Sequence, residues 1–159
     1  MNIGFIDTTY MSLGESESTR YIDTVIKKSK QHLHNTTSFG KEAVYDELNS
    51  ILKECKEANW DGNNALPVEE ATSEKTRYFI KALPLHIPLP SVGVEPDGQL
   101  TLEWHRDLRW TLSISISPEG TIHYAALFND DSIWGSENFS GTISTNLLNL
   151  IQKVHTTVS

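Results

Sequence analysis

The chain has 159 residues, about the size of one domain, and 38% of them are hydrophobic, so it can bury a core without covalent cross-links. Its single cysteine, Cys55, excludes an internal disulfide and a cysteine-rich zinc site. A formal net charge of -8 at pH 7 argues against direct nucleic acid binding, because phosphates repel it, and favours solubility or a basic partner.

Residues 1–17 are predicted to form an N-terminal arm. They are rich in Ser, Thr and Gly, and they contain neither a basic stretch nor the apolar run of a signal peptide. No part of the chain approaches the roughly 20 consecutive apolar residues that span a bilayer. We therefore expect a cytoplasmic protein that does not contact membranes.

Residues 18–58 are predicted to be a helical segment. One helix is expected over 18–33 and a clearer one over 41–58, where apolar residues recur at helical spacing and form one stripe. The members of this stripe are Val44, Leu48, Ile51, Leu52 and Cys55. Residues 59–159 are expected to form an α+β core, and the whole chain is a single domain.

The core segment opens with a loop at residues 59–67, and a third helix is expected at 69–83. The residues on one side of that helix are Ala71, Lys75, Tyr78, Phe79 and Ala82. Three prolines at 84, 88 and 90 then predict an extended connector, because each removes a backbone donor and disfavours helix in the residue before it.

The second half of the chain changes from helical spacing to alternation, which predicts strands. Pro96-Asp97-Gly98 and Pro118-Glu119-Gly120 are the same turn signal used twice, since proline presets the first turn residue and glycine accepts a positive φ. Counting outward gives the pairs Val94–Leu100, Val92–Leu102, Ile116–Ile122, Ile114–Tyr124, Leu112–Ala126 and Trp110–Phe128. Every pair is apolar, as a correct register requires.

The predicted fold class is α+β: an antiparallel β-meander of four to five strands with one face covered by three to four helices and the other face free. His105-Arg106-Asp107 is expected to be the turn in the middle of the meander, which places Glu103 opposite Arg109. Strands are expected at 91–95, 99–104, 108–117, 121–129 and 133–139. A last helix is expected at 145–155, with Ser144 or Thr145 as its N-cap.

Several stretches recur in a known order: Trp60-Asp61-Gly62-Asn63-Asn64-Ala65-Leu66-Pro67, Leu83-Pro84, Pro96-Asp97-Gly98 and Leu102-Glu103-Trp104. From residue 59 to about 141, roughly half the chain, this order resembles a bacterial family of small proteins with no established activity. That family reads Trp-Asp-Gly-aromatic-x-Ala-x-Pro, a helix, a proline-rich connector and a Pro-Asp-Gly hairpin running into Leu-Glu-Trp. Asn63 replaces the family's aromatic residue. The resemblance supports the fold and leaves the function open.

Asp61 and Asn63 are candidate binding residues on this loop. In a functional interpretation Asp61 is a ligand-binding or general-base carboxylate, held by a buried Trp60. The dense turn chemistry favours a structural interpretation instead, in which Trp60 anchors the loop and Asp61 accepts backbone N–H groups in an Asx-turn.

Glu103 and His123 are candidate binding residues on the free face of the sheet. Glu103, His105 and His123 are too dispersed in the predicted register to hold a metal ion, which needs about three converging ligands. Ser115, His123 and Glu103 supply the residue types of a triad, but without a nucleophile elbow or an oxyanion hole. We therefore predict no catalytic residue, no metal and no cofactor.

Trp134 follows Asp130 and Asp131 in a loop or at a sheet edge. An exposed tryptophan beside carboxylates is typical of a protein-binding hot spot, and the alternative is that it covers the end of the core. We predict a non-enzymatic protein-binding accessory module, antitoxin-like or inhibitor-like, whose acidic and aromatic surface binds a protein with a basic surface. Two copies pairing through a sheet edge is a further expectation.

Two other functions stay open. A hydrolytic enzyme would use Asp61, Glu103 or His123, and a deep pocket containing two of these would indicate it. An acidic DNA mimic that inhibits a nucleic-acid-binding protein would carry carboxylates spaced like phosphates along one ridge. The candidates for that ridge are Glu15, Glu17, Glu42, Glu47, Glu54, Glu57 and Asp61.

Overall fold

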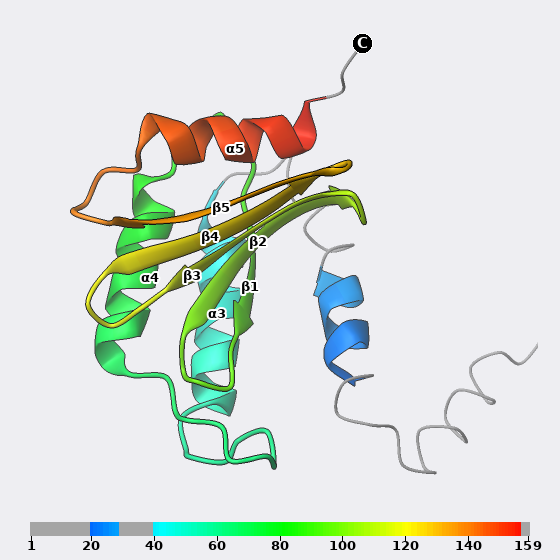
Figure 1. The fold of residues 1–159 in the computed structure, drawn as a ribbon. Helices are drawn as coiled ribbons and strands as arrows, with labels where there is room; N and C mark the ends of the chain where they lie inside the picture. The colour runs from blue at the N-terminus through cyan, green and yellow to red at the C-terminus, as the bar shows by residue number, and fades with distance from the viewer. Residues whose placement is uncertain (1–19, 29–39, 157–159) are drawn as a thin grey trace, which may run out of the picture.

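The computed structural model describes residues 20–28 and 40–156. The predicted arm at residues 1–17 lies outside them. The described elements are a helix at residues 20–28, α3 (Glu42–Glu54), α4 (Glu70–Ala82), β1 (Ser91–Val94), β2 (Leu100–Asp107), β3 (Trp110–Ile116), β4 (Thr121–Phe128), β5 (Asp131–Asn138) and α5 (Thr145–His155). They confirm the α+β class (Figure 1).

The five strands form one antiparallel sheet in the order β1-β2-β3-β4-β5, which is the predicted meander. All six predicted cross-strand pairs occur in the β1–β2 and β3–β4 ladders. Both predicted turns are closed by backbone hydrogen bonds, from Glu95 N–H to Gln99 O at 2.8 Å and from Ser117 N–H to Thr121 O at 3.0 Å. Their glycines have positive φ, as this turn type requires.

The turn between β2 and β3 does not lie where it was predicted. β2 continues through His105-Arg106-Asp107, with a register shift inside that stretch, and Leu108-Arg109 forms the turn. Asp107 closes this tighter turn, because its carboxylate accepts the N–H of Arg109 at 2.8 Å. Glu103 therefore pairs with Ser113, and its expected pairing with Arg109 was wrong.

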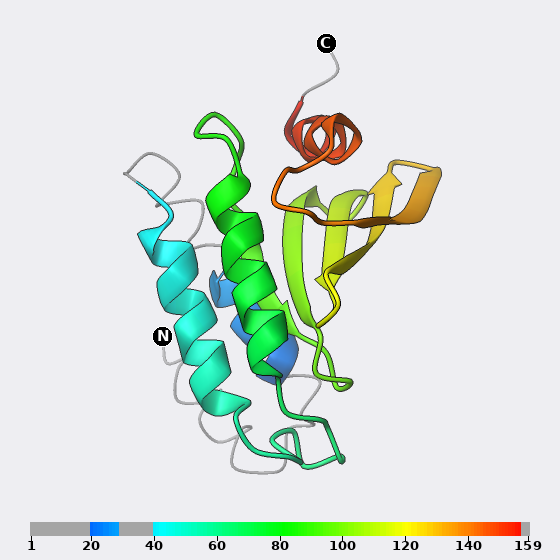
Figure 2. The same ribbon diagram turned by 90° about the vertical axis from the view of Figure 1, so that its left-hand side faces the viewer.

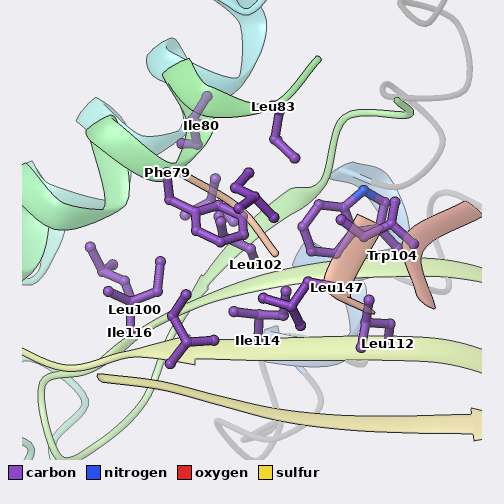
Figure 3. Close-up of a cluster of buried hydrophobic side chains, with 14 of the residues drawn as sticks. Phe79, Ile80, Leu83, Leu100, Leu102, Trp104, Leu112, Ile114, Ile116 and Leu147 are labelled. Atoms are coloured by element: carbon purple, nitrogen blue, oxygen red, sulfur yellow. The ribbon is translucent and has the colours of Figure 1, made fainter. Parts of the chain in front are cut away.

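Helices α3, α4 and α5 cover one face of the sheet (Figures 1 and 2). The core lies between these helices and the inward-pointing residues of the strands (Figure 3). Its largest fully buried side chains are Trp104, Phe79, Leu48, Ile80, Leu83, Leu100, Leu102, Leu112, Ile114, Ile116, Ile122 and Leu147. The predicted N-cap of α5 is confirmed, since the Ser144 side chain accepts the N–H of Leu147 at 3.1 Å.

The buried side of α4 differs from the predicted one. Thr72 and Thr76 are buried together with Phe79 and Ile80, while Tyr78 is exposed. Threonine tolerates this position because the Thr76 hydroxyl donates to the carbonyl oxygen of Thr72 at 2.8 Å, which satisfies it inside the helix. The predicted side, from Ala71 to Ala82, left out both threonines, and the helix is therefore rotated relative to the prediction.

We call the sheet face opposite α3, α4 and α5 the open face. Residues 20–28 reach its β1 end, where the Tyr21 hydroxyl lies 3.5 Å from the position that a Cβ on Gly93 would occupy. The Lys28 ammonium lies 3.9 Å from the Glu47 carboxylate of α3. The β3, β4 and β5 part of this face carries the candidate site.

Candidate functional site

Trp134 lies in the middle of β5, an edge strand of the sheet, and 75% of it is exposed. Its partner on β4 is Ala125, whose own partner on β3 is Ser113. Directly opposed residues share one face, and the neighbours of Ser113, Leu112 and Ile114, are buried in the core. Trp134 is therefore on the open face and does not cover the end of the core.

The surroundings of Trp134 explain its exposure. Its cross-strand neighbour is Ala125, and Ser132 and Ser136 flank it on the same face of β5. These three residues are themselves exposed, and none has a side chain long enough to cover an indole ring. The residues directly beside the ring are therefore small, and His123 and Leu127 are its diagonal neighbours on β4, which leaves the indole open to a partner's side chains.

A two-residue turn at Asn129 and Asp130 joins β4 to β5. Asn129 adopts a φ of 59°, which asparagine tolerates, and its N–H donates to the Arg109 carbonyl oxygen at 2.7 Å. Its side chain donates to the Asp130 carboxylate at 3.0 Å and accepts from the Arg109 guanidinium at 3.3 Å. Asp130 and Asp131 are both exposed, and Asp131 already belongs to β5.

Trp134 and Asp131 lie on opposite faces of β5, because they are three residues apart and side chains alternate. The rise of a strand separates their Cα atoms by about 10 Å. The acidic and aromatic groups therefore do not form one continuous patch. What they share is the outer edge of β5, which runs between them.

Glu103 and His123 also lie on the open face, but on strands that β3 separates. Glu103 is opposite Ser113, and His123 is opposite Ser115. Two strand spacings amount to about 10 Å, which is too far for a direct hydrogen bond between the two side chains. Trp134, His123 and Glu103 thus share a face without converging on one point.

Glu103 lies in the corner of the open face that residues 20–28 approach. Burial raises the pKa of the Glu103 carboxyl, His105 opposes this rise, and Glu95 and Glu47 add to it. Burial likewise raises the pKa of the Tyr21 hydroxyl, with smaller contributions from Glu103 and Glu95. This corner is therefore a desolvated environment that disfavours negative charge.

The sequence reasoning missed the contribution of Tyr21 and Glu95 to this corner. The Ser115 hydroxyl donates to the Glu95 carboxylate across the open face. A signal was present in Gly93, because a glycine between two strand valines often marks a place where another group approaches closely. The sequence does not say which segment approaches.

Asp61 and Asn63 lie in the loop between α3 and α4, away from the open face. The Asp61 carboxylate accepts the N–H of Asn63 at 2.8 Å and that of Ala65 at 3.0 Å. The indole N–H of the half-buried Trp60 donates to the Leu66 carbonyl oxygen at 2.8 Å. These are the contacts of the structural interpretation, in which the carboxylate stabilises its own loop.

The Cys55 thiol is not activated as a nucleophile. Burial raises the pKa of the Cys55 thiol to about 11, with Glu54 and Asp61 adding to the rise, so almost no thiolate exists at neutral pH. No three His, Cys, Asp or Glu side chains within residues 20–28 and 40–156 are placed to hold a metal ion. In the same part of the chain, no helix combines the length and apolarity needed to cross a bilayer.

A shallow hollow of about 290 Å³ lies between α5 and β3. Its lining residues are Trp110, Asn149, Gln152, Lys153 and Thr156. None of the three residues of the hydrolytic alternative is among them. The hollow also lies on the helix-covered side of the sheet, away from Trp134.

Comparisons of the chain with protein-family models, with curated proteins and with solved structures find no match. The resemblance drawn from the Trp60-Asp61-Gly62 loop and the hairpin motifs therefore stays an expectation.

Proposed function

We propose that the protein is a non-enzymatic protein-binding module whose contact surface is centred on Trp134. The observation that carries the proposal is the 75% exposure of this tryptophan in the middle of a regular strand. Among the described residues, the two large apolar residues that are more exposed than Trp134, Leu85 and Leu108, lie in a connector and a turn. Trp134 instead belongs to a strand that is paired with β4 through eight residue pairs. Because its backbone is already ordered, burying this side chain in an interface costs little conformational entropy.

The charge of the hairpin supports a partner with a basic surface. Asp130 and Asp131 are exposed at the tip, Glu137 is half-buried further along β5, and the whole chain carries a net charge of -8. Opposite charge on the partner would steer the encounter and disfavour acidic competitors. A module of this kind would act by covering a surface of its target, in the manner of an inhibitor or an antitoxin.

The two alternatives have less support in the geometry. A hydrolytic site is disfavoured because the Asp61 carboxylate already accepts two loop N–H groups, while Glu103 and His123 lie on strands separated by β3. A DNA mimic needs an uninterrupted ridge of carboxylates. Cations interrupt the described part of the proposed ridge, because Lys53 lies on α3 and Lys28 lies beside Glu47.

The proposal is tested by capturing proteins from a lysate of the native host with three immobilised forms of the chain. These are the wild type, Trp134→Ala and a matched control, Tyr78→Ala, which removes an exposed ring on α4. We expect the wild type and the control to retain the same protein in equal amount, and Trp134→Ala to bind it at least about tenfold more weakly. Equal capture by Trp134→Ala would overturn the proposal.

A further inference from the structure

Two hydrogen bonds determine which backbone groups of β5 point away from the sheet. Phe139, just beyond β5, donates its N–H to the Gly120 carbonyl oxygen at 2.9 Å. In an antiparallel ladder this means that the backbone N–H and C=O groups of the odd-numbered residues of β5 point toward β4. At the other end of β4, the Asn129 N–H donates to the Arg109 carbonyl oxygen, so the odd-numbered residues of β4 pair with β3 and its even-numbered residues pair with β5. Both hydrogen bonds therefore give the same assignment for β5. The residues of β5 whose backbone N–H and C=O groups point away from the sheet are therefore Ser132, Trp134, Ser136 and Asn138.

In the described part of the chain, this edge has few of the features that protect sheet edges, and the two charged residues of β5, Asp131 and Glu137, are the exception. β5 contains no proline and no lysine, and its pairing with β4 runs without a bulge from Asp131 to Asn138. Among the described elements it packs extensively only against β4 (Figure 2). β1, the opposite edge, is only four residues long and has residues 20–28 against it. A long and regular edge that no described element covers is a template for another strand.

The charges of β5 select among the strands that could pair with it. Asp131 and Glu137 lie six residues apart on the same side of the strand, the side that faces the core of the sheet. Two copies of β5 could pair antiparallel with Trp134 opposite either Trp134 or Ser136 of the second copy. In the first register Asp131 lies directly opposite Glu137 of the other copy, and in the second it lies diagonally opposite. Like charges so placed are destabilising, which disfavours a second copy.

We propose that the outer edge of β5 binds an extended segment of the partner protein as a sixth, antiparallel strand, with basic side chains opposite Asp131 and Glu137. This inference rests on the proposed function and specifies the conformation and charge of the partner. If the segment residue opposite Glu137 is position 1, position 4 lies opposite Trp134 and position 7 opposite Asp131. Positions 1 and 7 are then basic, position 4 is apolar or aromatic, and position 5 is apolar against Ile133.

An acetylated and amidated heptapeptide, Lys-Thr-Val-Tyr-Val-Thr-Lys, is the probe of this geometry, and hydrogen exchange of the full-length protein is the readout. We expect the peptide to slow exchange at the outward N–H groups of Ser132, Trp134 and Ser136. Exchange at Ile133 and Gly135, which already pair with β4, should change little. Protection without this alternation, or no protection at millimolar peptide, would overturn the inference.

Two matched pairs of controls separate backbone pairing from charge. Replacing both lysines of the peptide by glutamate should weaken binding at least about tenfold, since two attractive cross-strand pairs become repulsive. N-methylation of peptide position 4, whose N–H faces β5, should abolish binding, while N-methylation of position 3, whose N–H faces away, should not. Equal binding by the acidic peptide, or equal effects of the two methylations, would contradict the inference.

The same distinction is available in the protein. Ser136→Pro removes an outward N–H and leaves the β4 ladder intact, whereas Ser136→Ala keeps the N–H. We expect Ser136→Pro to lose at least about tenfold in affinity and Ser136→Ala to stay within about twofold. If Ser136→Pro does not fold, the methylated peptides decide the same point.

The outcomes with the captured partner separate this inference from the proposed function. Weaker binding by Trp134→Ala together with unchanged binding by Ser136→Pro would overturn strand addition and leave the Trp134 surface standing. Unchanged binding by both variants would overturn both. Alternating protection of β5 that appears in the protein alone, as its concentration rises, would show that a second copy occupies the edge and would overturn the choice of partner.

Discussion

Substitution of Gly135 by alanine tests the packing that holds β5 beneath Trp134. A Cβ at this position would contact the hydroxyl of Tyr124 and lie 2.6 Å from its Cζ, because the Tyr124 ring crosses the glycine on the core-facing side of the strand. The ring cannot move away freely, since its hydroxyl also accepts a hydrogen bond from the Asn146 side chain at 3.3 Å. Gly135 is thus the space that lets an aromatic side chain cover an edge strand.

Overpacking of this kind costs about 1–3 kcal/mol, while replacing glycine in a strand interior regains about 0.5–1 kcal/mol of conformational entropy. The difference between these ranges is about 0–2.5 kcal/mol, and the 2.6 Å approach to Cζ favours its upper part, so we expect Gly135→Ala to lower the free energy of unfolding by about 1–2 kcal/mol. For a chain of this length, that corresponds to a fall in Tm of roughly 3–6 °C. Urea unfolding monitored by circular dichroism measures the first quantity, and Ser136→Ala, on the same strand, is the control.

A double-mutant cycle identifies the cause of the loss. Tyr124→Val removes the ring, so Gly135→Ala should cost almost nothing in that background, with a coupling energy of at least about 1 kcal/mol. Two results would contradict this account: Gly135→Ala is neutral or stabilising in the wild type, or its cost is the same with and without Tyr124. In either case the Tyr124 ring does not lie across β5 and does not hold the strand that carries Trp134.

Three further predictions concern the groups that compete with Trp134 for a functional role. Asp61→Ala should lower the free energy of unfolding by about 1–3 kcal/mol, because two loop N–H groups lose their acceptor, and should leave partner binding unchanged; a stable variant that no longer binds would show the opposite role. Glu103→Gln should stabilise the protein at pH 7: a carboxyl whose pKa is raised in the folded state favours folding below its unfolded pKa, near 4.5, and loses that contribution as the pH rises through the folded pKa. Urea titrations of wild type and Glu103→Gln should therefore converge toward pH 4, and a difference independent of pH would count against burial of this carboxyl. Cys55 should react with iodoacetamide at pH 7.4 only after unfolding, since its thiol pKa is about 11; rapid alkylation of the native protein, followed by mass spectrometry, would refute this.

The strands and their register could be predicted because their signals are local. Alternation locates the strands, and two proline- and glycine-containing turns count the residues between them, so pairs such as Ile114–Tyr124 follow by arithmetic. The β2–β3 turn could not be placed in this way. It depends on one hydrogen bond from the Arg109 N–H to Asp107, in a stretch where His105-Arg106-Asp107 is as polar as a turn.

The candidate site was predicted less completely, because its geometry depends on packing between distant segments. Sequence order placed Trp134 near Asp131, but the predicted strand began at residue 133, and only the observed start of β5 at Asp131 shows that the two side chains lie on opposite faces of the strand. The approach of Tyr21 to Gly93 crosses more than seventy residues of sequence and leaves only a glycine as a trace. The exposure of Trp134 follows from its position on an edge strand and from the small size of Ala125 and two serines directly beside it.

The most direct measurement is the NMR spectrum of the four indole N–H groups, recorded for the free protein and for its complex with the captured partner. Trp60 and Trp104 already donate to the carbonyl oxygens of Leu66 and Pro88 at 2.8 and 2.7 Å, so their signals should stay where they are. The signal of Trp134 should shift and become protected from exchange with water. A shift at Trp60 with Trp134 unchanged would contradict this, and would place binding at the loop of Asp61 instead of at β5.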